Sequence, residues 1–255
     1  MFKLGEGSFA EVYGAVSSGG NLSAYKIMPI DGSVLVNGEA QQTSAQVLPE
    51  VAATLALSAL APGVGEAENS TPHFIGCSGI SVCKGVYPSE LLGEWDAWDR
   101  ENASENDRPD AFGDDQLFLI FSFQNGGEDL ESIEFKTAEE AAAVLRQVCF
   151  ALAVAEKALA FEHRDLHWGN VLIKPCDVTS VSAALDGRGA QIATGGVHAS
   201  IIDFTLSRLE IDGETYYLDL EADPELFTGE GDEQFDCYRK MRRAVRRNWG
   251  CFNPQ

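Results

Sequence analysis

The segment His163–Asn170 holds the residues of this 255-residue chain that are best suited to chemistry. It reads H-R-D-L-H-W-G-N and fits the pattern H-R-D-L-x-x-x-N at every fixed position. The carboxylate of Asp165 can accept a hydroxyl proton or orient a nucleophile, and the amide oxygen of Asn170 can coordinate a metal ion. We therefore expect a compact loop that points both groups into one cleft.

A second carboxylate, Asp203, directly follows the apolar pair Ile201-Ile202. An ionised group at the end of a buried strand is costly unless it binds a metal or joins a hydrogen-bond network. Asp203 is therefore a further candidate metal ligand beside Asn170. An aspartate that only caps a turn gives the same local pattern.

A zinc site is a weaker interpretation of the same region. His163 and His167 are four residues apart and could share one face of a helix. The zinc-protease pattern, however, requires a glutamate directly after the first histidine, where this chain has Arg164. The spacing therefore disfavours zinc.

Near the amino terminus, the segment 5–12 fits the pattern G-x-G-x-x-[GA]-x-V through Gly5, Gly7, Ala10 and Val12. Glycines let the backbone approach phosphates closely and offer N–H donors to them. A dinucleotide-binding fold would need a strand before this motif and a helix after it. Only four residues precede it and a strand-like sequence follows, which argues against that fold.

Lys26 lies on a short apolar strand 14 residues after Val12, where a hairpin would bring it under the glycine-rich turn. Its ammonium could bind phosphates, although a lysine in mid-strand can also simply face solvent. Glu50, on an apolar helical segment, is the best candidate to pair with it, although it could also be a surface residue near a helix start. The order in which a protein kinase requires its parts is matched by the glycine-rich turn, Lys26, Glu50, Asp165, Asn170 and Asp203.

The elements that position these residues predict an α+β fold. Strands are expected over 1–30, 74–87 and 117–123, a helix over 43–60, and a long buried helix over 137–161 that includes Cys149 as a core residue. Segment 94–115 predicts a solvated helix end or loop, and 177–198 an insertion loop. We expect two lobes divided near Gly126-Gly127, about 1–125 rich in strands with one main helix and about 126–255 mostly helical.

The chain carries 40 acidic and 18 basic residues, a net charge of −22. This charge argues against direct nucleic-acid binding and favours a basic partner, although it also serves solubility. No apolar run approaches the 18 residues of a membrane span, and the first residues do not form a secretory signal. Six cysteines without a C-x-x-C pair indicate reduced thiols in an intracellular protein.

With these residues in this order, the chain resembles the haspin family of atypical eukaryotic serine/threonine protein kinases. The resemblance covers nearly the whole chain, and the family characteristically has D-[YF]-T in place of D-F-G and lacks A-P-E, as here. The matching blocks include Asn37-Gly38, 48–50, 106–110, 114–118, 163–172, 201–209, 226–229 and 234–236.

The resemblance implies a two-lobed kinase fold that uses ATP and Mg²⁺. Lys26 would pair with Glu50 and bind ATP phosphates, Asp165 would be the catalytic aspartate, and Asn170 and Asp203 would hold magnesium. Further implied ATP contacts are Phe123 as gatekeeper, Gln124 to Gly126 as hinge, and Asp129 at the ribose and substrate edge. His167, Asp129, Asp223 and Glu225 would bind substrate, and Asp236 would hold the catalytic loop from the next long helix.

The substrate implied by the family is a threonine near the amino terminus of histone H3, a basic tail, and the place is the mitotic chromosome in the nucleus. The chain's own charge agrees, because 210–236 contains eleven acidic residues and no Lys or Arg. A solvated acidic face would look the same. We expect a monomer without direct contact to nucleic acid or membrane.

Two departures and two alternatives accompany this interpretation. The chain begins almost on the glycine-rich turn and ends at Pro254-Gln255, so we expect the carboxyl-terminal lobe to be incomplete. A small-molecule phosphotransferase of the aminoglycoside or choline kinase type shares H-x-D-x-x-x-x-N, but Arg164 and the 203–208 block speak against it. A non-catalytic module that holds ATP or a histone tail without turnover is the other alternative.

Overall fold

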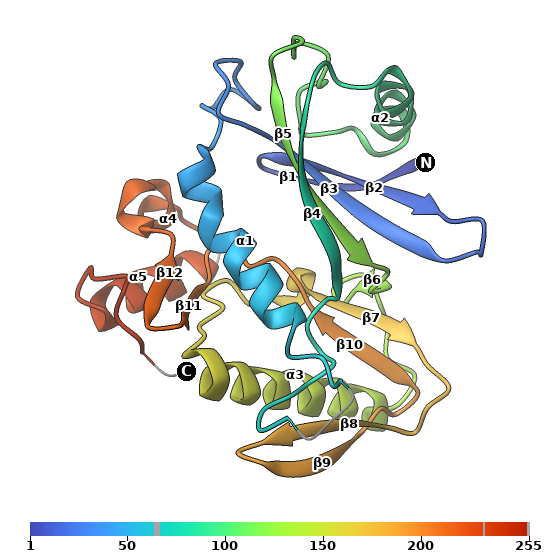
Figure 1. The fold of residues 1–255 in the computed structure, drawn as a ribbon, viewed down its shortest axis with the longest axis vertical. Coiled ribbons are helices and arrows are strands. Elements are labelled where there is room, and N and C mark those ends of the chain that lie inside the picture. The colour runs from blue at the N-terminus through green and yellow to red at the C-terminus, as the bar shows by residue number, and fades with distance from the viewer. Residues whose placement is uncertain (64–66, 232, 254–255) are drawn as a thin grey trace. The chain divides into compact units, whose positions relative to one another are not determined.

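The structure is a computed structural model that describes residues 1–63, 67–231 and 233–253 (Figure 1). The chain divides into two compact units, one of residues 1–47 and 76–125 and the other of residues 48–75 and 126–255. The sequence analysis placed 48–75 with the first lobe, and the structure groups this segment with the second unit. Pro254 and Gln255, named in that analysis, and position 232 of the acidic stretch 210–236 lie outside the described residues.

The first unit is built on a five-stranded antiparallel sheet of order β1-β2-β3-β5-β4. Its strands are β1 (Phe2–Gly7), β2 (Ala10–Val16), β3 (Leu22–Ile30), β4 (Cys77–Lys84) and β5 (Leu117–Gln124). Helix α2 (Ser89–Asn102) lies between β4 and β5 in the chain and contacts β1. The sequence analysis expected only a helix end or loop here.

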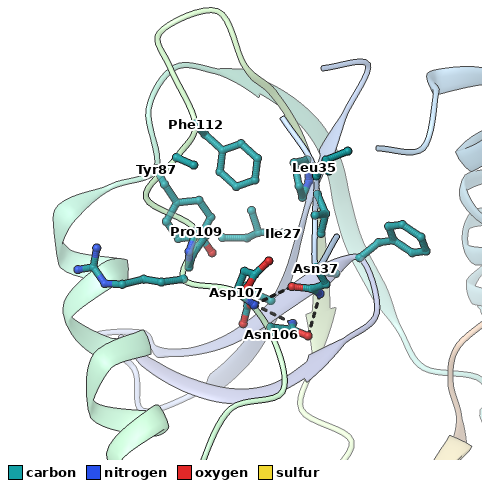
Figure 2. Close-up of a pocket in the computed structure, with 15 residues that line it drawn as sticks. Ile27, Leu35, Asn37, Tyr87, Asn106, Asp107, Pro109 and Phe112 are labelled. Carbon is teal, nitrogen blue, oxygen red and sulfur yellow. Dashed lines mark hydrogen bonds between the residues drawn. The ribbon is translucent and has the colours of Figure 1, made fainter. Parts of the chain in front are cut away.

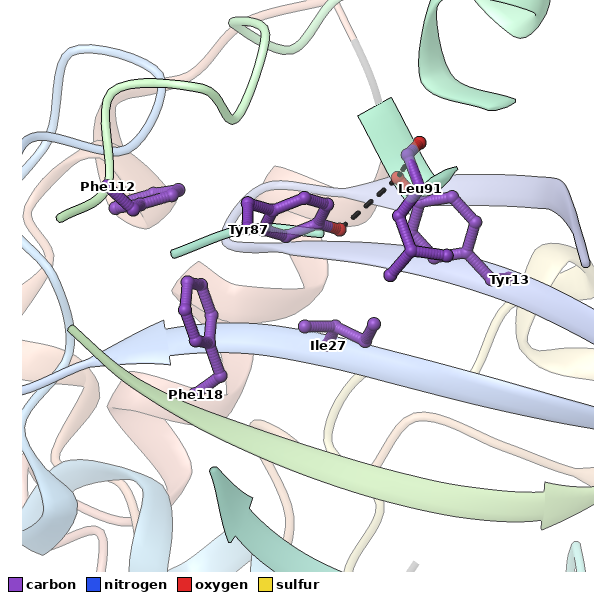
Figure 3. Close-up of a cluster of buried hydrophobic side chains, with 6 residues drawn as sticks. All are labelled: Tyr13, Ile27, Tyr87, Leu91, Phe112 and Phe118. Atoms are coloured by element: carbon purple, nitrogen blue, oxygen red, sulfur yellow. Dashed lines mark hydrogen bonds between the residues drawn. The ribbon is translucent and has the colours of Figure 1, made fainter. Parts of the chain in front are cut away.

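An aromatic cluster fills the core of this unit on one face of the sheet (Figure 3). Tyr13 of β2 and Ile27 of β3 pack with Tyr87 and Phe118, and the Tyr87 hydroxyl donates to the Tyr13 hydroxyl at 3.2 Å. Phe112 meets Phe118 edge-on at a ring separation of 5.4 Å. Buried aromatic rings supply large apolar areas, so this cluster fixes the sheet against the segments around it.

The second unit contains most of the helix and several short sheets. Helix α1 (Ser44–Ser58) begins in the first unit and continues into the second, and α3 (Ala138–Leu159) begins at the N-cap Thr137, whose side chain accepts from the Glu140 N–H. The remaining elements are β6 (Glu128–Asp129), η1 (Trp168–Asn170), β7 (Val171–Pro175), β8 (Ser180–Leu185), β9 (Arg188–Ala193), β10 (Val197–Ile201), β11 (Arg208–Ile211), β12 (Glu214–Tyr217), η2 (Leu220–Ala222), α4 (Glu225–Thr228) and α5 (Glu233–Ala244).

The mixed α+β class is confirmed, but the second unit has more strand than the mostly helical lobe that we expected. Segment 177–198, predicted as an insertion loop, contains the hairpin β8–β9, which packs on α3, and the start of β10 (Figure 1). The hairpin turns at Asp186-Gly187, where both residues have positive φ. This dipeptide favours a two-residue hairpin turn, so the sequence did contain the signal.

Helix α3 is amphipathic and not buried all round. Gln147 is buried in it and ties the helix to β10, accepting from the Ala199 N–H at 2.9 Å and donating to the Val197 carbonyl at 3.1 Å. Leu145 is 64% exposed, and Cys149, expected in the core, is also exposed. Alanine-rich turns carry the buried face here, so the larger apolar residues were not a reliable guide to burial.

Within the residues that the structure describes, the six cysteines form no disulfide with one another. Within those residues, helices long and apolar enough to cross a bilayer are absent.

Candidate active site

The glycine-rich turn connects β1 to β2, and its register separates two faces. Gly5 pairs with Val12 and Gly7 with Ala10, whereas Glu6 pairs with Glu11. Because side chains alternate along a strand, the first four residues share one face and the two glutamates share the other. A Cβ atom added at Gly5 or Gly7 would meet nothing within 4 Å. The backbone there is open to a ligand that must come close.

Lys26 lies on the same face of the sheet as the glycines. It pairs with Val12 on one side and with Phe121 of β5 on the other, and its Nζ lies 5.8 Å from the Phe121 ring centroid. Phe123 follows on that face, stacked on Phe121 with an interplanar angle of 4°. The Gln124 N–H donates to the Gly76 carbonyl at 2.8 Å. The predicted nucleotide contacts of the first unit thus share one sheet face and its edge.

Glu50 belongs to α1 in the second unit and is buried. A buried carboxylate requires compensation by a cation or hydrogen bonds, which agrees with the role predicted for it. Because Lys26 belongs to the other unit, their ion pair stays a prediction.

In the second unit, two hydrogen bonds connect the segments that carry Asp165, Asn170 and Asp203. The Asn170 Nδ2 donates to the Asp165 carbonyl at 2.9 Å, and the Ile202 N–H donates to the Asn170 carbonyl at 3.0 Å. The pairing of β7 with β10 is the reason, since Val171 lies opposite Ile201 in the antiparallel register. Asn170 directly precedes β7 and Asp203 follows β10, so the three predicted groups meet at one end of these strands.

Asp203 has a backbone conformation that few non-glycine residues adopt, with φ of 61°. Its Oδ1 accepts from both the backbone N–H and the hydroxyl of Thr205, at 3.2 and 2.8 Å. The threonine that replaces the glycine of D-F-G therefore supplies a hydroxyl that orients the carboxylate. The next residue, Phe204, is buried, and its ring contacts the aromatic rings of Phe74, Phe161 and His163.

The two histidines of the motif do not form a zinc pair. His163 is buried, with its Nε2 2.9 Å from the Ile202 carbonyl, and burial lowers its pKa, so it is neutral at pH 7. His167 is exposed, and its Nδ1 accepts from the Gly169 N–H at 3.1 Å. Within the described part of the chain, His, Cys, Asp and Glu residues form no cluster of three or more that could hold a metal.

Asp165 is held by two side chains of α5 that the sequence analysis missed. Its Oδ1 accepts from the Tyr238 hydroxyl at 2.6 Å and from the Gln234 Nε2 at 2.7 Å. Burial, together with the bond to Asp165, raises the pKa of Tyr238, so the phenol keeps the proton that it donates. The two residues are four apart on one helix, and that spacing was the only signal of a shared face.

The expectation that Asp236 holds the catalytic loop is wrong. Its Oδ1 accepts from Arg239 Nη2 at 2.7 Å on the exposed side of α5. The helix period explains the difference, because residue 236 points away from the face shared by 234 and 238.

Arg164 anchors the loop from inside. Its Nε donates to the Glu162 carboxylate at 3.0 Å, its Nη2 donates to the Trp249 carbonyl at 2.7 Å, and the guanidinium lies 5.5 Å from the Trp249 ring centroid. Both charged side chains are almost fully buried. Such a pair, once formed, is very costly to break, because it leaves one uncompensated charge.

The predicted substrate carboxylates Asp129, Asp223 and Glu225 all belong to the second unit. Asp129 accepts from the backbone N–H and the hydroxyl of Ser132 at 2.8 and 2.9 Å, which fixes the turn after β6. Asp223 and Glu225 are exposed at the start of α4, where Asp223 Oδ1 accepts from the Glu225 N–H at 3.1 Å. Within the described residues, the side chain of Asp129 bonds Ser132 and that of Asp223 bonds a backbone N–H, so the common role of the three carboxylates stays a prediction.

Gly126 and Gly127 begin the longer segment of the second unit and have no room for a side chain. A Cβ at Gly126 would lie 2.5 Å from a methyl of Leu172. Gly127 has φ of 97°, and a Cβ there would lie 2.0 Å from the Ile173 carbonyl oxygen. Only glycine fits this close approach of the segment to β7.

These features define a class: a protein kinase domain, with a glycine-rich hairpin and lysine in one unit and the H-R-D-L-x-x-x-N loop with its second aspartate in the other. The model of the "Haspin like kinase domain" matches residues 2–255. The chain belongs to this haspin-like family of serine/threonine protein kinases.

Relatives in animals and plants agree. Over 254 residues the chain is 45% identical to the serine/threonine-protein kinase haspin of Mus musculus, covering 99% of this chain and 33% of that protein. It is 42% identical to a haspin homolog of Arabidopsis thaliana, covering 98% of this chain and 41% of that one. The homolog of Drosophila melanogaster is 38% identical, with 99% and 45% covered. The chain thus spans less than half the length of these relatives.

Proposed function

We propose that this chain is the catalytic domain of an ATP-dependent serine/threonine protein kinase. The observation that carries the proposal is the joining of Asp165, Asn170 and the strand end before Asp203 by direct hydrogen bonds, with the Asp165 carboxylate fixed from α5. A rigidly held carboxylate can orient a substrate hydroxyl and accept its proton, which is what phosphoryl transfer asks of a protein.

The residues of this chain divide the work between them. Lys26 would bind the phosphates as a point charge beneath the open backbone of Gly5 and Gly7, whose N–H groups can approach them. Asp165 would orient the attacking hydroxyl and take its proton at the carboxylate. His163, neutral and buried, would keep the loop packed against Phe204.

The residues present also fit a magnesium ion. Asn170 commits its amide nitrogen to the Asp165 carbonyl, which leaves the amide oxygen as its ligating atom, and Asp203 adds carboxylate oxygen. Hard oxygen donors of this kind are what Mg²⁺ binds. When bound, the ion would neutralise charge on the phosphate oxygens.

Transfer of radiolabelled phosphate from ATP to a histone H3 tail peptide tests this function. Asp165→Asn should lower turnover by about 10²- to 10⁴-fold, the usual contribution of a general base. Asp177→Asn, an exposed aspartate of the same unit, is the matched control and should keep its activity. A folded wild-type chain without transfer, or transfer that Asp165→Asn leaves unchanged, would contradict the proposal.

Two further measurements separate the alternatives. Nucleotide affinity measured beside turnover identifies a non-catalytic module, which would bind ATP without consuming it. Turnover on choline or aminoglycosides but not on peptides would identify a small-molecule phosphotransferase.

We further infer that the substrate is a threonine in the basic amino-terminal tail of histone H3. The support is electrostatic: a net charge of −22 and an acidic stretch, 210–236, in which Asp223 and Glu225 are exposed. Carboxylates bind arginine and lysine through charge-assisted hydrogen bonds, which are roughly twice as strong as neutral ones. The family resemblance adds a nuclear, chromosome-associated role in mitosis.

The double variant Asp223→Asn/Glu225→Gln tests the substrate proposal. The KM for the tail peptide should rise about tenfold or more, with the KM for ATP unchanged, because one charge-assisted bond is worth about 1.5–3 kcal/mol. Asp212→Asn/Glu230→Gln removes the same charge from exposed positions of the same stretch and serves as control. Equal effects of the two double variants would show that only net charge matters. Imaging of a tagged chain through the cell cycle tests the chromosomal location.

A further inference from the structure

We propose that Asn37 and Asn106 are positioning residues that clamp the backbone of the glycine-rich turn and thereby set nucleotide affinity. This proposal deepens the kinase function above and rests on it for the part that concerns ATP. The two amides come from loops far apart in the sequence, and all groups concerned belong to the first unit.

The clamp consists of direct bonds to the two carbonyls of the turn. The Asn106 Nδ2 donates to the Gly7 carbonyl at 3.1 Å, and the Asn37 Nδ2 donates to the Ser8 carbonyl at 2.8 Å. The amides also hold each other, with Asn37 Nδ2 donating to Asn106 Oδ1 at 2.9 Å, as the dashed lines of Figure 2 show. Asn37 Oδ1 accepts from the Asp107 N–H at 2.7 Å, which fixes its orientation.

The strand register places this clamp on the side of the sheet opposite the face that Gly5, Gly7 and Lys26 share. Glu6 and Glu11 point to the face opposite Gly5 and Gly7, where Asn106 Nδ2 also donates to Glu11 Oε1 at 2.9 Å. The Glu6 carboxylate accepts from the Ser104 hydroxyl at 2.6 Å and from the Glu105 N–H at 2.9 Å. The turn is therefore held from one side and left open on the other.

A buried cation completes the support on that side. Lys3 Nζ lies 2.7 Å from Glu6 Oε2 and 2.6 Å from Glu11 Oε2, and it sits 5.2 Å from the Trp95 ring centroid of α2. Its side chain is fully buried. The hairpin is thus connected to α2 and to segment 104–107 through side chains, beyond its own ladder.

The functional consequence concerns the free protein. A glycine-rich turn that must order on binding loses conformational freedom at that moment, which weakens affinity. The two amides hold the carbonyls of the turn before nucleotide arrives, so they lower that cost. A cavity of about 230 Å³ adjoins both amides (Figure 2), so trimming either side chain opens onto existing space and does not create a sealed void.

Asn106→Ala and Asn37→Gly test the clamp in the full 255-residue chain. Glycine is chosen at 37 because φ there is 52°, so the side chain is removed without backbone strain. We expect a 3- to 10-fold rise in the KM and Kd for ATP with kcat nearly unchanged, the effect of about one lost hydrogen bond. Asn102→Ala, in which an amide that donates to the Trp98 carbonyl of its own helix is removed, is the matched control.

Hydrogen exchange in the nucleotide-free protein tests the clamp independently of catalysis. The amides of residues 6–10 should exchange about 3- to 10-fold faster in both variants, with β3 and β5 unchanged. Unchanged exchange at the turn, or acceleration spread over the whole sheet, would overturn the proposal. If the wild type neither binds nor turns over ATP, the kinase function fails, and the exchange result still decides whether the clamp exists.

Discussion

A buried histidine pair makes the stability of the second unit depend on pH. His73 is fully buried, with its Nδ1 3.0 Å from the Ala199 carbonyl, and its ring lies 4.8 Å from that of His198. Burial lowers the pKa of His73 from 6.5 to about 4, and the neighbouring His198 acts in the same direction. Burial also lowers the pKa of His198, and Lys174 adds to that effect.

The sign of the effect follows from where each state binds its proton. As the pH falls below 6.5, the unfolded chain protonates residue 73 while the folded chain keeps it neutral until about pH 4. The contribution of His73 to the unfolding free energy is therefore fully present above pH 6.5 and is lost progressively down to pH 4. Because one pKa unit corresponds to about 1.4 kcal/mol, His73 alone accounts for about 3 kcal/mol of unfolding free energy over this window.

His73→Asn is the perturbation that isolates this effect. Asparagine keeps a donor near the Nδ1 position for the Ala199 carbonyl but has no proton to gain. Urea unfolding, followed by tryptophan fluorescence between about pH 7 and pH 4.5, gives the unfolding free energy of both proteins. The unfolding free energy of the wild type should fall by about 2–3 kcal/mol relative to that of the variant as the pH falls over this range.

The control is His167→Asn, which removes an exposed histidine of the same unit. Parallel curves for wild type and His73→Asn would show that His73 binds its proton equally in the folded and unfolded states. That result would refute the reasoning from burial.

Three further outcomes follow from the site. Tyr238→Phe removes one hydrogen bond to the Asp165 carboxylate and should lower kcat about 10- to 100-fold with KM nearly unchanged, because bonds to charged groups are worth about 1.5–3 kcal/mol; steady-state kinetics measure it, and an unchanged kcat would show that the bond does not position Asp165. Gly127→Ala should destabilise the fold by well over 2 kcal/mol, since its Cβ would meet a backbone oxygen, whereas Gly113→Ala, with open space around it, should cost less than about 1 kcal/mol; thermal unfolding compares the two. Arg164→Ala leaves its buried glutamate partner uncompensated and should lower the unfolding free energy by about 3–5 kcal/mol in urea titrations, a loss below about 1 kcal/mol counting against a buried ion pair.

Local patterns in the sequence predicted the parts of the site that depend on neighbours along the chain. The apolar run before Asp203 predicted that this group ends a buried strand, and the fixed spacing of Asp165 and Asn170 predicted that they share one loop; the pairing of β7 with β10 was found only in the structure. The glycine-rich pattern likewise predicted a backbone that a ligand can approach closely, and a Cβ added at Gly5 or Gly7 would meet nothing within 4 Å. Residues that share a strand or a short loop have few ways to be arranged, so their types and spacing carry the information.

Contacts between distant segments were not predictable in this way. Gln234 and Tyr238 meet Asp165 across 69 and 73 residues, and Asp236 looked equally suitable until the helix face was known. Asn37 and Asn106 likewise meet across 69 residues. Such pairs depend on how whole elements dock, and one polar residue on a helix resembles the next until the docking face is known.

The contacts that hold the loop 163–170 also have a consequence for how the chain folds during synthesis. Arg164 relies on the carbonyl of Trp249, 85 residues further on, and Asp165 relies on α5. A ribosome therefore releases the loop well before it releases the groups that secure it. Until residue 249 has emerged, the nascent polypeptide carries a charged arginine whose final hydrogen-bond acceptor has not yet been synthesised. The loop 163–170 is therefore among the last parts of the second unit to adopt its final structure.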